Sequence, residues 1–265
     1  MRIGLIQMQC EKGQVERNLA TTAQYLAEAT VRGVDVVAFP EMSLTGYADP
    51  TKDSAAMLDL GGPEVGELLK LSERYPLTAL VGLIERNPAG KPFITQVVVR
   101  QGALLGCYRK ITIKDEELEW FAPGRGVAVF RSGGVTCGLA VCADIHNEAV
   151  FAECHREGAS FMFELAAPGL YGEQATRDWA AGYTWWEGEC QAYLGRYARE
   201  YGLWIAVATQ AGRTVDEDFP GGGYVFAPGG ERVYATSDWR PGGLYVTVDL
   251  ESRQVAHLET TTCGE

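Results

Sequence analysis

The chain alternates short apolar runs with amphipathic stretches, a pattern typical of an α/β layered domain. Within residues 18–32, the apolar positions 19, 23, 26 and 27 share one face of a helix, and Gly33 follows where such a helix would end. Residues 34–39 are mostly apolar, which predicts a buried strand. The first half is also expected to contain a strand over 3–8, a helix over 64–75, and strands over 77–85, 94–100 and 103–109.

The second half continues in the same style without repeating the sequence. A long helix is predicted over 175–201, and Gly202 ends it before a strand over 203–209. The other predicted elements are strands near 127–131, 135–141 and 159–164, a helix over about 148–157, and a strand over 243–250 that closes the sheet. No low-complexity linker interrupts this order, so residues 1–265 are predicted to form one domain.

Acidic residues outnumber basic ones, with 35 Asp plus Glu against 23 Lys plus Arg and a formal net charge of −12. No basic cluster stands out that could follow a phosphate backbone or anionic lipids, so neither nucleic acid nor a membrane surface is an expected partner. No apolar run approaches the roughly 18 residues that span a bilayer. Residues 1–10 also lack the apolar core of a signal peptide.

The seven cysteines are odd in number and scattered, which argues against a disulfide framework and favours a reducing compartment. We therefore predict a cytoplasmic location. A zinc site needs paired Cys or His residues at short spacing, but Cys137 and Cys142 have no second pair and the three histidines form no ligand cluster. No metal site is expected.

Cys142 is the best candidate nucleophile in the chain. It ends the apolar run of residues 138–141, and a helix is expected to open near Asn147. A nucleophile at such a corner is displayed on a rigid element, and the backbone N–H groups that follow can point toward a developing oxyanion. Taken alone, a free cysteine is more often a small buried hydrophobe, and we expect the other six to be of that kind.

Glu41 comes directly after the predicted buried strand, in the segment Phe39-Pro40-Glu41. Sheet proteins place functional groups at the carboxyl ends of strands, which would put Glu41 at the floor of a pocket. Pro40 cannot donate a ladder hydrogen bond, so the strand should end there. For the isolated residue, a carboxylate that merely caps a turn is the better interpretation.

Lys110 follows Arg109 at the end of another predicted strand, and residues 115–124 form an acidic and aromatic loop that contains Glu117. A lysine held by carboxylates stays protonated and can stabilise an oxyanion. The alternative is that Arg109, Lys110 and these acids form a solvated charged face, the usual fate of such runs.

The order of these segments is more specific than any one of them. Nearly the whole chain, from Gly4 to Gly230, resembles the nitrilase superfamily of carbon–nitrogen hydrolases. The matching segments are Phe-Pro-Glu-x-x-Leu-Thr-Gly-Tyr at 39–47, Tyr-Arg-Lys at 108–110, a glutamate ahead of Phe-Ala-Pro-Gly at 121–124, and Gly-x-x-x-Cys-x-Asp at 138–144.

The resemblance implies a four-layer α-β-β-α sandwich that assembles as a homodimer or a larger homo-oligomer. It also implies a catalytic triad carried onto Glu41, Lys110 and Cys142, with Glu117 as the second glutamate. The implied reaction is hydrolysis of a non-peptide C–N bond, in an amide or N-carbamoyl group of a small molecule, through a thioester on Cys142. Glu41 would take the thiol proton, and Lys110 with the Ala143 N–H would hold the oxyanion. This chemistry needs no cofactor.

Three departures from the family pattern affect supporting positions. Ile-His-Asn-Glu at 145–148 stands where relatives often have Phe-Pro-Glu, Phe-Ile-Thr-Gln at 93–96 replaces Tyr-Asn-Ser, and Phe-Pro-Gly-Gly-Gly at 219–223 replaces Phe-x-Gly-x-Ser. His146 is expected at the rim of the pocket and outside the chemistry. The four catalytic candidates are all present.

The nucleophile segment also bears on the substrate. Relatives that hydrolyse nitriles tend to have Cys-Trp-Glu, whereas this chain has Cys-Ala-Asp at 142–144, so an amidase or carbamoyl hydrolase is favoured over a true nitrilase. Ala143 leaves room for a bulky acyl group, and Tyr47 and Trp185 are further candidates for substrate contact. Residues 179–189 could line a pocket for an aromatic or cationic substrate. Aromatic residues at helical spacing more often bury in a core or a subunit interface.

Two alternatives from other classes remain at this point. A binding or scaffold protein could keep the fold and lose turnover, although it would have no need of all four catalytic candidates. An acyltransferase or amidotransferase would pass the thioester to an amine, but relatives of that kind usually carry a membrane segment or a fused synthetase domain. Neither is recognised in these 265 residues.

Overall fold

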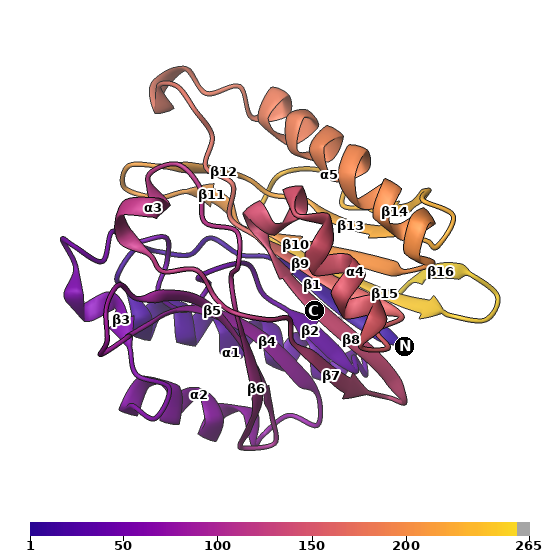
Figure 1. Ribbon diagram of the computed structural model, residues 1–265, viewed down its shortest axis with the longest axis horizontal. Coiled ribbons are helices and arrows are strands. Elements are labelled where there is room, and N and C mark those ends of the chain that lie inside the picture. Colours follow the sequence, from indigo (N-terminus) through magenta and orange to yellow (C-terminus); the bar gives the residue numbers. More distant parts are fainter. Residues whose placement is uncertain (259–265) are drawn as a thin grey trace, which may run out of the picture.

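The computed structural model describes residues 1–258, in which two mixed β-sheets pack face to face between two layers of helices (Figure 1). Helices α1 (Val15–Val31) and α2 (Pro63–Ser72) cover the outer face of the first sheet. Helices α4 (Glu148–Arg156) and α5 (Trp179–Tyr201) cover the outer face of the second. The predicted four-layer α-β-β-α sandwich is confirmed.

The first sheet has eight strands in the order β16-β15-β1-β2-β4-β5-β6, with β3 paired to β4. They are β1 (Arg2–Gln7), β2 (Val36–Ala38), β3 (Met57–Leu58), β4 (Thr78–Glu85), β5 (Phe93–Arg100), β6 (Ala103–Arg109), β15 (Gly242–Asp249) and β16 (Gln254–His257). The β5–β6 turn is Gln101-Gly102, and both residues have positive φ, as a tight hairpin requires.

The second sheet has six strands in the order β14-β13-β10-β9-β8-β7. They are β7 (Val129–Ser132), β8 (Val135–Val141), β9 (Phe161–Ala166), β10 (Trp204–Thr209), β13 (Gly223–Phe226) and β14 (Arg232–Ala235). The remaining elements lie in connections: the paired strands β11 (Ala211–Arg213) and β12 (Asp218–Pro220), the short helix α3 (Glu117–Trp120), and 3-10 turns at Ser54–Ala56, Cys142–His146 and Gln174–Thr176.

Strands β1 and β2 divide the core through the alternation of their side chains. Ile3 and Val36 belong to the cluster between the two sheets. Val37 belongs to the cluster that the first sheet forms with Leu26 of α1 and Leu68 of α2. Because both faces of these strands are buried, the sequence shows continuous apolar runs there and no polar alternation.

The long helix begins four residues later than predicted. Asp178 caps it by accepting a hydrogen bond from the Ala181 N–H, so α5 starts at Trp179, and residues 174–176 form a separate 3-10 turn. Its end is as predicted, because Gly202 adopts the left-handed conformation with φ 64°. Helix α1 starts at Val15, three residues before the predicted start.

The prediction that residues 243–250 close the sheet is wrong. Strand β15 lies between β1 and β16, so the edge is formed by β16, which was not predicted. Only four residues long and largely exposed, β16 has no apolar pattern that would reveal it. The short strands β3, β11, β12 and β14 were missed for the same reason of length.

The strand directions gather the candidate residues at one end of the sandwich. Strand β2 is parallel to β4, and β6 runs the same way because β5 is antiparallel to both β4 and β6. Glu41 follows β2 and Lys110 follows β6 at this edge. In the second sheet, the parallel strands β8 and β9 lead into Cys142 and Ala167.

No helix within residues 1–258 combines the length and apolar character needed to cross a membrane. The cytoplasmic location and the homo-oligomeric state stay predictions.

Gly82 in β4 allows the turn that carries Glu41 to pack directly on the sheet. A Cβ atom at Gly82 would lie 2.3 Å from the Met42 backbone nitrogen and 2.7 Å from the Pro40 carbonyl oxygen. The turn is also hydrogen-bonded to this strand, since the Gly82 N–H donates to Ser43 Oγ and the Gly82 carbonyl accepts from the Leu44 N–H.

We expect Gly82→Ala to lower the free energy of unfolding by about 1–3 kcal/mol, because backbone atoms must move apart to admit the methyl group. Urea unfolding measures this change. Gly106→Ala is the matched control, because a Cβ at Gly106 of β6 meets no atom within 4 Å. Equal effects of the two substitutions would contradict the close approach.

Candidate active site

Cys142 stands at a strained corner between β8 and the 3-10 turn Cys142–His146. Its φ is 48°, an uncommon value for a residue with a side chain. The Asp144 side chain stabilises this corner. Its Oδ2 accepts hydrogen bonds from the Val141 N–H (3.0 Å) and the Tyr108 hydroxyl (2.7 Å). Its Oδ1 accepts a third from the Thr112 N–H at 2.8 Å. Cys142 lies between strand β8 and helix α4, as predicted, with the 3-10 turn Cys142–His146 joining the two.

Asp144 belongs to the Cys-x-Asp segment, but the sequence alone predicts no role for it. Its side chain is fully buried and accepts hydrogen bonds from one hydroxyl group and two backbone N–H groups. Two of these donors, on Tyr108 and Thr112, lie more than 30 residues before Asp144 in the chain. Tyr108 belongs to β6 of the first sheet, so Asp144 links the nucleophile corner to both sheets. The fixed spacing to Cys142 was the available signal.

Lys110 lies between two carboxylates and is sealed from solvent. Its Nζ is 2.8 Å from Glu41 Oε1, and 2.7 and 2.8 Å from the two oxygens of Glu117. Lys110 is 1% exposed and Glu41 0%, so the interpretation of Lys110 as part of a solvated charged face is wrong. Arg109 is the residue that points outward, where it pairs with Glu85.

Glu41 and Glu117 each accept a further hydrogen bond besides those from Lys110. The second oxygen of Glu41 accepts the Ala167 N–H at 3.1 Å, so Glu41 does more than cap its own turn. Glu117 comes from the short helix α3 and accepts a further hydrogen bond from the Tyr47 hydroxyl at 2.5 Å. Residues that are far apart along the chain therefore fix one another's positions.

The charges of this cluster set the protonation states. Burial raises the pKa of Glu41 to about 7, and the negative charge of Glu117 adds to the rise while Lys110 opposes it. Burial alone would lower the pKa of Lys110, but Glu41 and Glu117 outweigh it and hold this pKa well above its usual range. Burial and the Glu41 charge raise the pKa of Cys142 well above normal, so the sulfur is a thiol at neutral pH.

Glu164 on β9 is another buried carboxyl of this region that the sequence did not reveal. It is fully buried, and neither oxygen has a hydrogen-bond partner among residues 1–258. Burial raises its pKa well above the usual range, with further raising by Asp144 and Glu41. Lys110 opposes this rise, but burial is the largest effect and favours the protonated form of Glu164.

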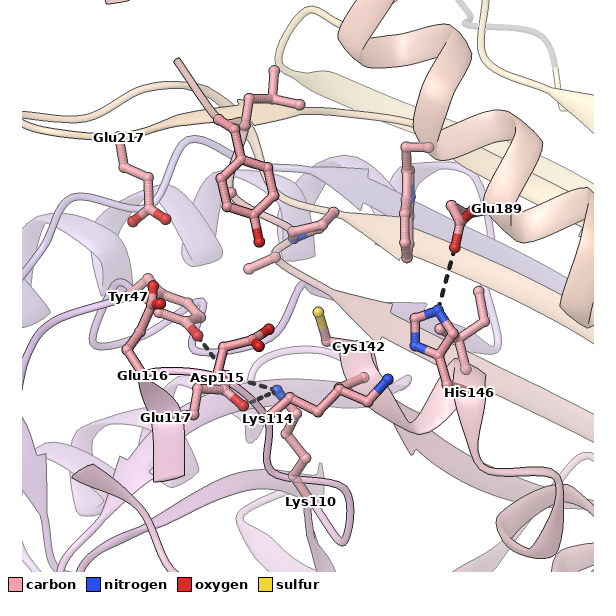
Figure 2. Close-up of a pocket in the computed structure, with 18 of the residues that line it drawn as sticks. Tyr47, Lys110, Lys114, Asp115, Glu116, Glu117, Cys142, His146, Glu189 and Glu217 are labelled. Carbon is pink, nitrogen blue, oxygen red and sulfur yellow. Dashed lines mark hydrogen bonds and ion pairs between the residues drawn. The ribbon is translucent and has the colours of Figure 1, made fainter. Parts of the chain in front are cut away.

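A cavity of about 290 Å³ opens above Cys142. Figure 2 shows the sulfur between the Lys110–Glu117 pair on one side and the His146–Glu189 pair on the other. The predicted substrate contacts Tyr47, Ala143 and Trp185 all line this cavity, as do the less expected residues Lys114, Asp115, Glu116, Leu170, Tyr171, Glu189 and Glu217.

The aromatic stretch of α5 divides between core and cavity. Trp186 is buried and its Nε1 donates to Thr209 Oγ1 at 2.8 Å, as the core interpretation requires. Trp185 is 44% exposed and lines the cavity, so the core interpretation is wrong for this residue. His146 lies at the rim, 3.2 Å from Glu189 and away from Lys110.

Four of the other six cysteines are buried, as predicted. Cys10, Cys137, Cys154 and Cys190 are buried free thiols, whereas Cys107 is half-buried and Cys263 lies outside the described residues. Across residues 1–258, no group of three or more His, Cys, Asp or Glu side chains has the arrangement of a metal site.

The chain matches the carbon-nitrogen hydrolase family model over residues 2–257. It belongs to the carbon–nitrogen hydrolase family. This membership confirms the resemblance inferred from the order of the motifs. Among solved structures, an amidase of Nesterenkonia sp. AN1 from the nitrilase superfamily has a TM-score of 0.80 at 23% identity, with 94% of this chain and 93% of that chain covered. A likeness at that identity supports the fold.

Among curated relatives, a glutamine-dependent NAD(+) synthetase of Thermotoga maritima is 28% identical over 95% of this chain and 42% of its own length. A formamidase of Pseudomonas syringae is 30% identical over 51% of this chain and 40% of its own length. A hydrolase of Mycobacterium tuberculosis is 29% identical over 64% of this chain and 62% of its own. The chain spans less than two thirds of the length of each of these relatives.

The raised pKa of Glu41 predicts an unusual pH dependence. A general base works only when deprotonated, so kcat/KM for amide hydrolysis should fall as the pH drops through about 7. An unperturbed glutamate would place this fall at a pH of about 4.3. Because the charge of Glu117 raises the pKa of Glu41, Glu117→Gln should move the fall to lower pH in the residual activity.

The measurement is kcat/KM between pH 4 and 9, with circular dichroism over the same range as the control for folding. A midpoint near that of a free carboxylic acid, unmoved by Glu117→Gln, would exclude Glu41 as the base.

Proposed function

We propose that this chain hydrolyses the amide or N-carbamoyl bond of a small molecule through a thioester on Cys142, releasing ammonia or an amine. The observation that carries the proposal is the buried Lys110 ammonium, held by Glu41 and Glu117 beside the only cysteine that lines the catalytic cavity among residues 1–258. A scaffold protein has no need to bury three charges at a cavity, because their desolvation costs several kcal/mol.

In the proposed first half-reaction, Glu41 takes the thiol proton as the Cys142 sulfur attacks the carbonyl carbon. The resulting oxyanion is stabilised by the Lys110 ammonium and the Ala143 N–H, both fixed before the reaction begins. Protonated Glu41 then gives its proton to the leaving nitrogen, the C–N bond breaks, and a thioester remains. Because the thiol pKa is raised, attack depends on this base.

In the second half-reaction, Glu41 takes a proton from water as the water oxygen attacks the thioester carbon. The C–S bond then breaks, the acid is released, and Glu41 returns the proton to the Cys142 sulfur. Glu117 keeps Lys110 charged and in position, with Tyr47 fixing one Glu117 oxygen. Every group in this scheme other than the substrate and water belongs to the protein, so the scheme uses no cofactor.

The amide class is supported by the chemistry of a similar protein. In a structure of a glutamate-to-glutamine mutant of the Nesterenkonia amidase, the acetamide moiety of fluoroacetamide is added covalently at the active-site cysteine. For this chain, Cys-Ala-Asp at 142–144 and the open space beside Ala143 favour an amide or carbamoyl group over a nitrile.

Glutamine is a second candidate substrate. The glutamine-dependent NAD(+) synthetases of Thermotoga maritima and Acinetobacter baylyi match 95% and 97% of this chain, over 42% and 46% of their own lengths. This chain would then release ammonia from the glutamine amide for a second reaction. A panel containing glutamine, simple amides, N-carbamoyl amines and nitriles, scored by ammonia release, distinguishes the candidates.

Cys142→Ala should reduce turnover by more than about 10³-fold while the protein stays folded. The matched control is Cys137→Ala in strand β8, which leads into Cys142, because the Cys137 thiol is buried away from the cavity. The wild type, incubated with substrate and quenched in acid, should show the acyl mass on the peptide containing Cys142. Full hydrolysis by Cys142→Ala would overturn the proposed function.

The cavity lining is predominantly acidic. The carboxylates are Asp115, Glu116, Glu117, Glu189 and Glu217, against the ammonium groups of Lys110 and Lys114. Lys110 is paired with Glu41 and Glu117, and Glu217 is paired with Lys12. The remaining carboxylates Asp115, Glu116 and Glu189 outnumber the ammonium group of Lys114, so an anionic substrate meets net repulsion at the mouth.

We therefore expect succinamate to have a kcat/KM about tenfold below that of its uncharged isostere 4-methylpentanamide at low ionic strength. Raising the salt concentration from about 0.02 M to about 0.5 M should shrink the difference, because the Debye length falls. Asp115→Asn should shrink it as well, whereas Glu153→Gln on the outer helix α4 should not. Equal rates at low salt would contradict an acidic mouth.

A further inference from the structure

One wall of the cavity above Cys142 is an irregular segment that joins β9 to α5. Residues 167–171 line the cavity, and the segment from 167 to 178 has no regular structure beyond the 3-10 turn Gln174–Thr176. Its first residue, Ala167, donates its N–H to Glu41. The course of this segment therefore sets the shape of the cavity beside the catalytic groups.

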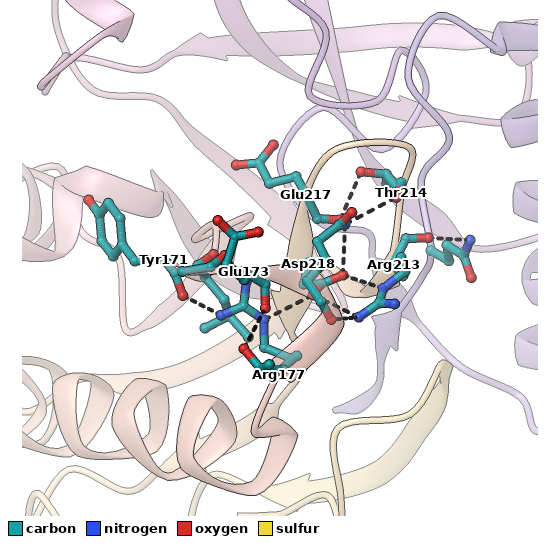
Figure 3. Close-up of polar contacts among 12 residues, drawn as sticks. Tyr171, Glu173, Arg177, Arg213, Thr214, Glu217 and Asp218 are labelled. Carbon is teal, nitrogen blue, oxygen red and sulfur yellow. Dashed lines mark hydrogen bonds and ion pairs between the residues drawn. The ribbon is translucent and has the colours of Figure 1, made fainter.

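Asp218, the first residue of β12, is the anchor for this segment. Its side chain is fully buried and accepts hydrogen bonds from Arg177 Nε (2.9 Å), Arg213 Nε (2.9 Å) and Gln174 Nε2 (3.0 Å). The backbone carbonyl of Asp218 accepts the Leu170 N–H at 2.8 Å. Figure 3 shows Asp218 between the two guanidinium groups.

Arg177 uses its remaining donors on the segment itself. One terminal nitrogen donates to the carbonyls of Leu170 (2.8 Å) and Gly172 (3.1 Å), and the other to the carbonyl of Tyr171. Only 9% of the Arg177 side chain is exposed. One planar guanidinium thus fixes three consecutive peptide groups against Asp218, an arrangement that the flexible ammonium of lysine cannot reproduce.

Two of the three residues bound by Arg177 belong to the wall, and Gly172 directly follows them. Leu170 and Tyr171 line the catalytic cavity, and Tyr171 is 86% exposed, with its backbone and not its side chain held in place. Within residues 1–258, the side chains of the four proposed catalytic residues form no hydrogen bond or ion pair with Arg177 or Asp218. Loss of this clamp should therefore displace the wall and leave the chemical groups in position.

Given the proposed function, we propose that Arg177 and Asp218 are positioning residues that hold residues 170–172 as the wall against which the distal part of the substrate packs. A small amide such as acetamide reaches only the catalytic groups. A longer amide such as hexanamide must extend along the cavity and contact the wall. Selectivity for the longer substrate then depends on the clamp, because misplacement by even 1 Å can cost a large part of binding.

The test uses two alkylating reagents, iodoacetamide and N-hexyl-iodoacetamide, and follows the modification of Cys142 by mass spectrometry. Alkylation needs no turnover, so it tests the wall even if the proposed hydrolysis fails, and hydrolysis itself is tested separately by Cys142→Ala. Arg177→Gln and Asp218→Asn should each lower the rate ratio of the longer to the shorter reagent by about tenfold. The same variants should raise KM for hexanamide while leaving kcat for acetamide within about threefold.

Arg177→Lys keeps the positive charge but loses the planar guanidinium, so its reagent rate ratio should lie between those of the wild type and Arg177→Gln. This variant also provides the test if Arg177→Gln does not fold. The Arg177→Gln/Asp218→Asn double variant should be no worse than either single variant, because both remove one clamp. Arg86→Gln is the matched control, since Arg86 also pairs with a carboxylate, Asp59, and donates to the Met57 carbonyl but does not line the cavity. Variants that lose thermal stability with an unchanged reagent ratio would overturn the proposal and leave a purely structural ion pair.

Discussion

The buried ammonium of Lys110 is the charge on which the rest of the site depends. A cation without exposed surface must be paired, and here two carboxylates lie within 2.8 Å of it. Glu41 reaches Lys110 from the turn after β2, and Glu117 reaches it from α3. Each of these segments is short and irregular, so the ion pairs and the hydrogen bonds around them give the site its rigidity.

The proposed nucleophile Cys142 is held by a second set of contacts, which crosses between the sheets. Asp144 binds the backbone at the end of β8 and the hydroxyl of Tyr108 on β6, so the position of Cys142 follows the packing of the two sheets. Both sets of contacts lie where parallel strands end, because chain directions alone bring their carboxyl ends to one edge. Catalytic geometry and core packing are therefore coupled.

Burial changes the pKa values of both Cys142 and Glu41. Burial keeps the Cys142 sulfur protonated and brings the pKa of Glu41 to about 7, so a carboxyl group that ionises near neutral pH lies beside a thiol. The cavity above them is walled on one side by a segment with little regular structure, which Arg177 and Asp218 hold in place. Apart from the hydrogen bond from the Ala167 N–H to Glu41, the wall and the Lys110 cluster are held by different contacts.

The sequence by itself determined the layered fold, most of the elements, and the set Glu41, Lys110, Glu117 and Cys142, because apolar periodicity and ordered motifs are local properties of the chain. Only the tertiary structure showed that Lys110 is buried, that Trp185 faces the cavity while Trp186 packs inside, and that Asp144 and Arg177 organise their surroundings. Those facts depend on contacts between residues far apart along the chain. Neither the periodicity nor the spacing of residues records which side chains the folded sheets will bring together.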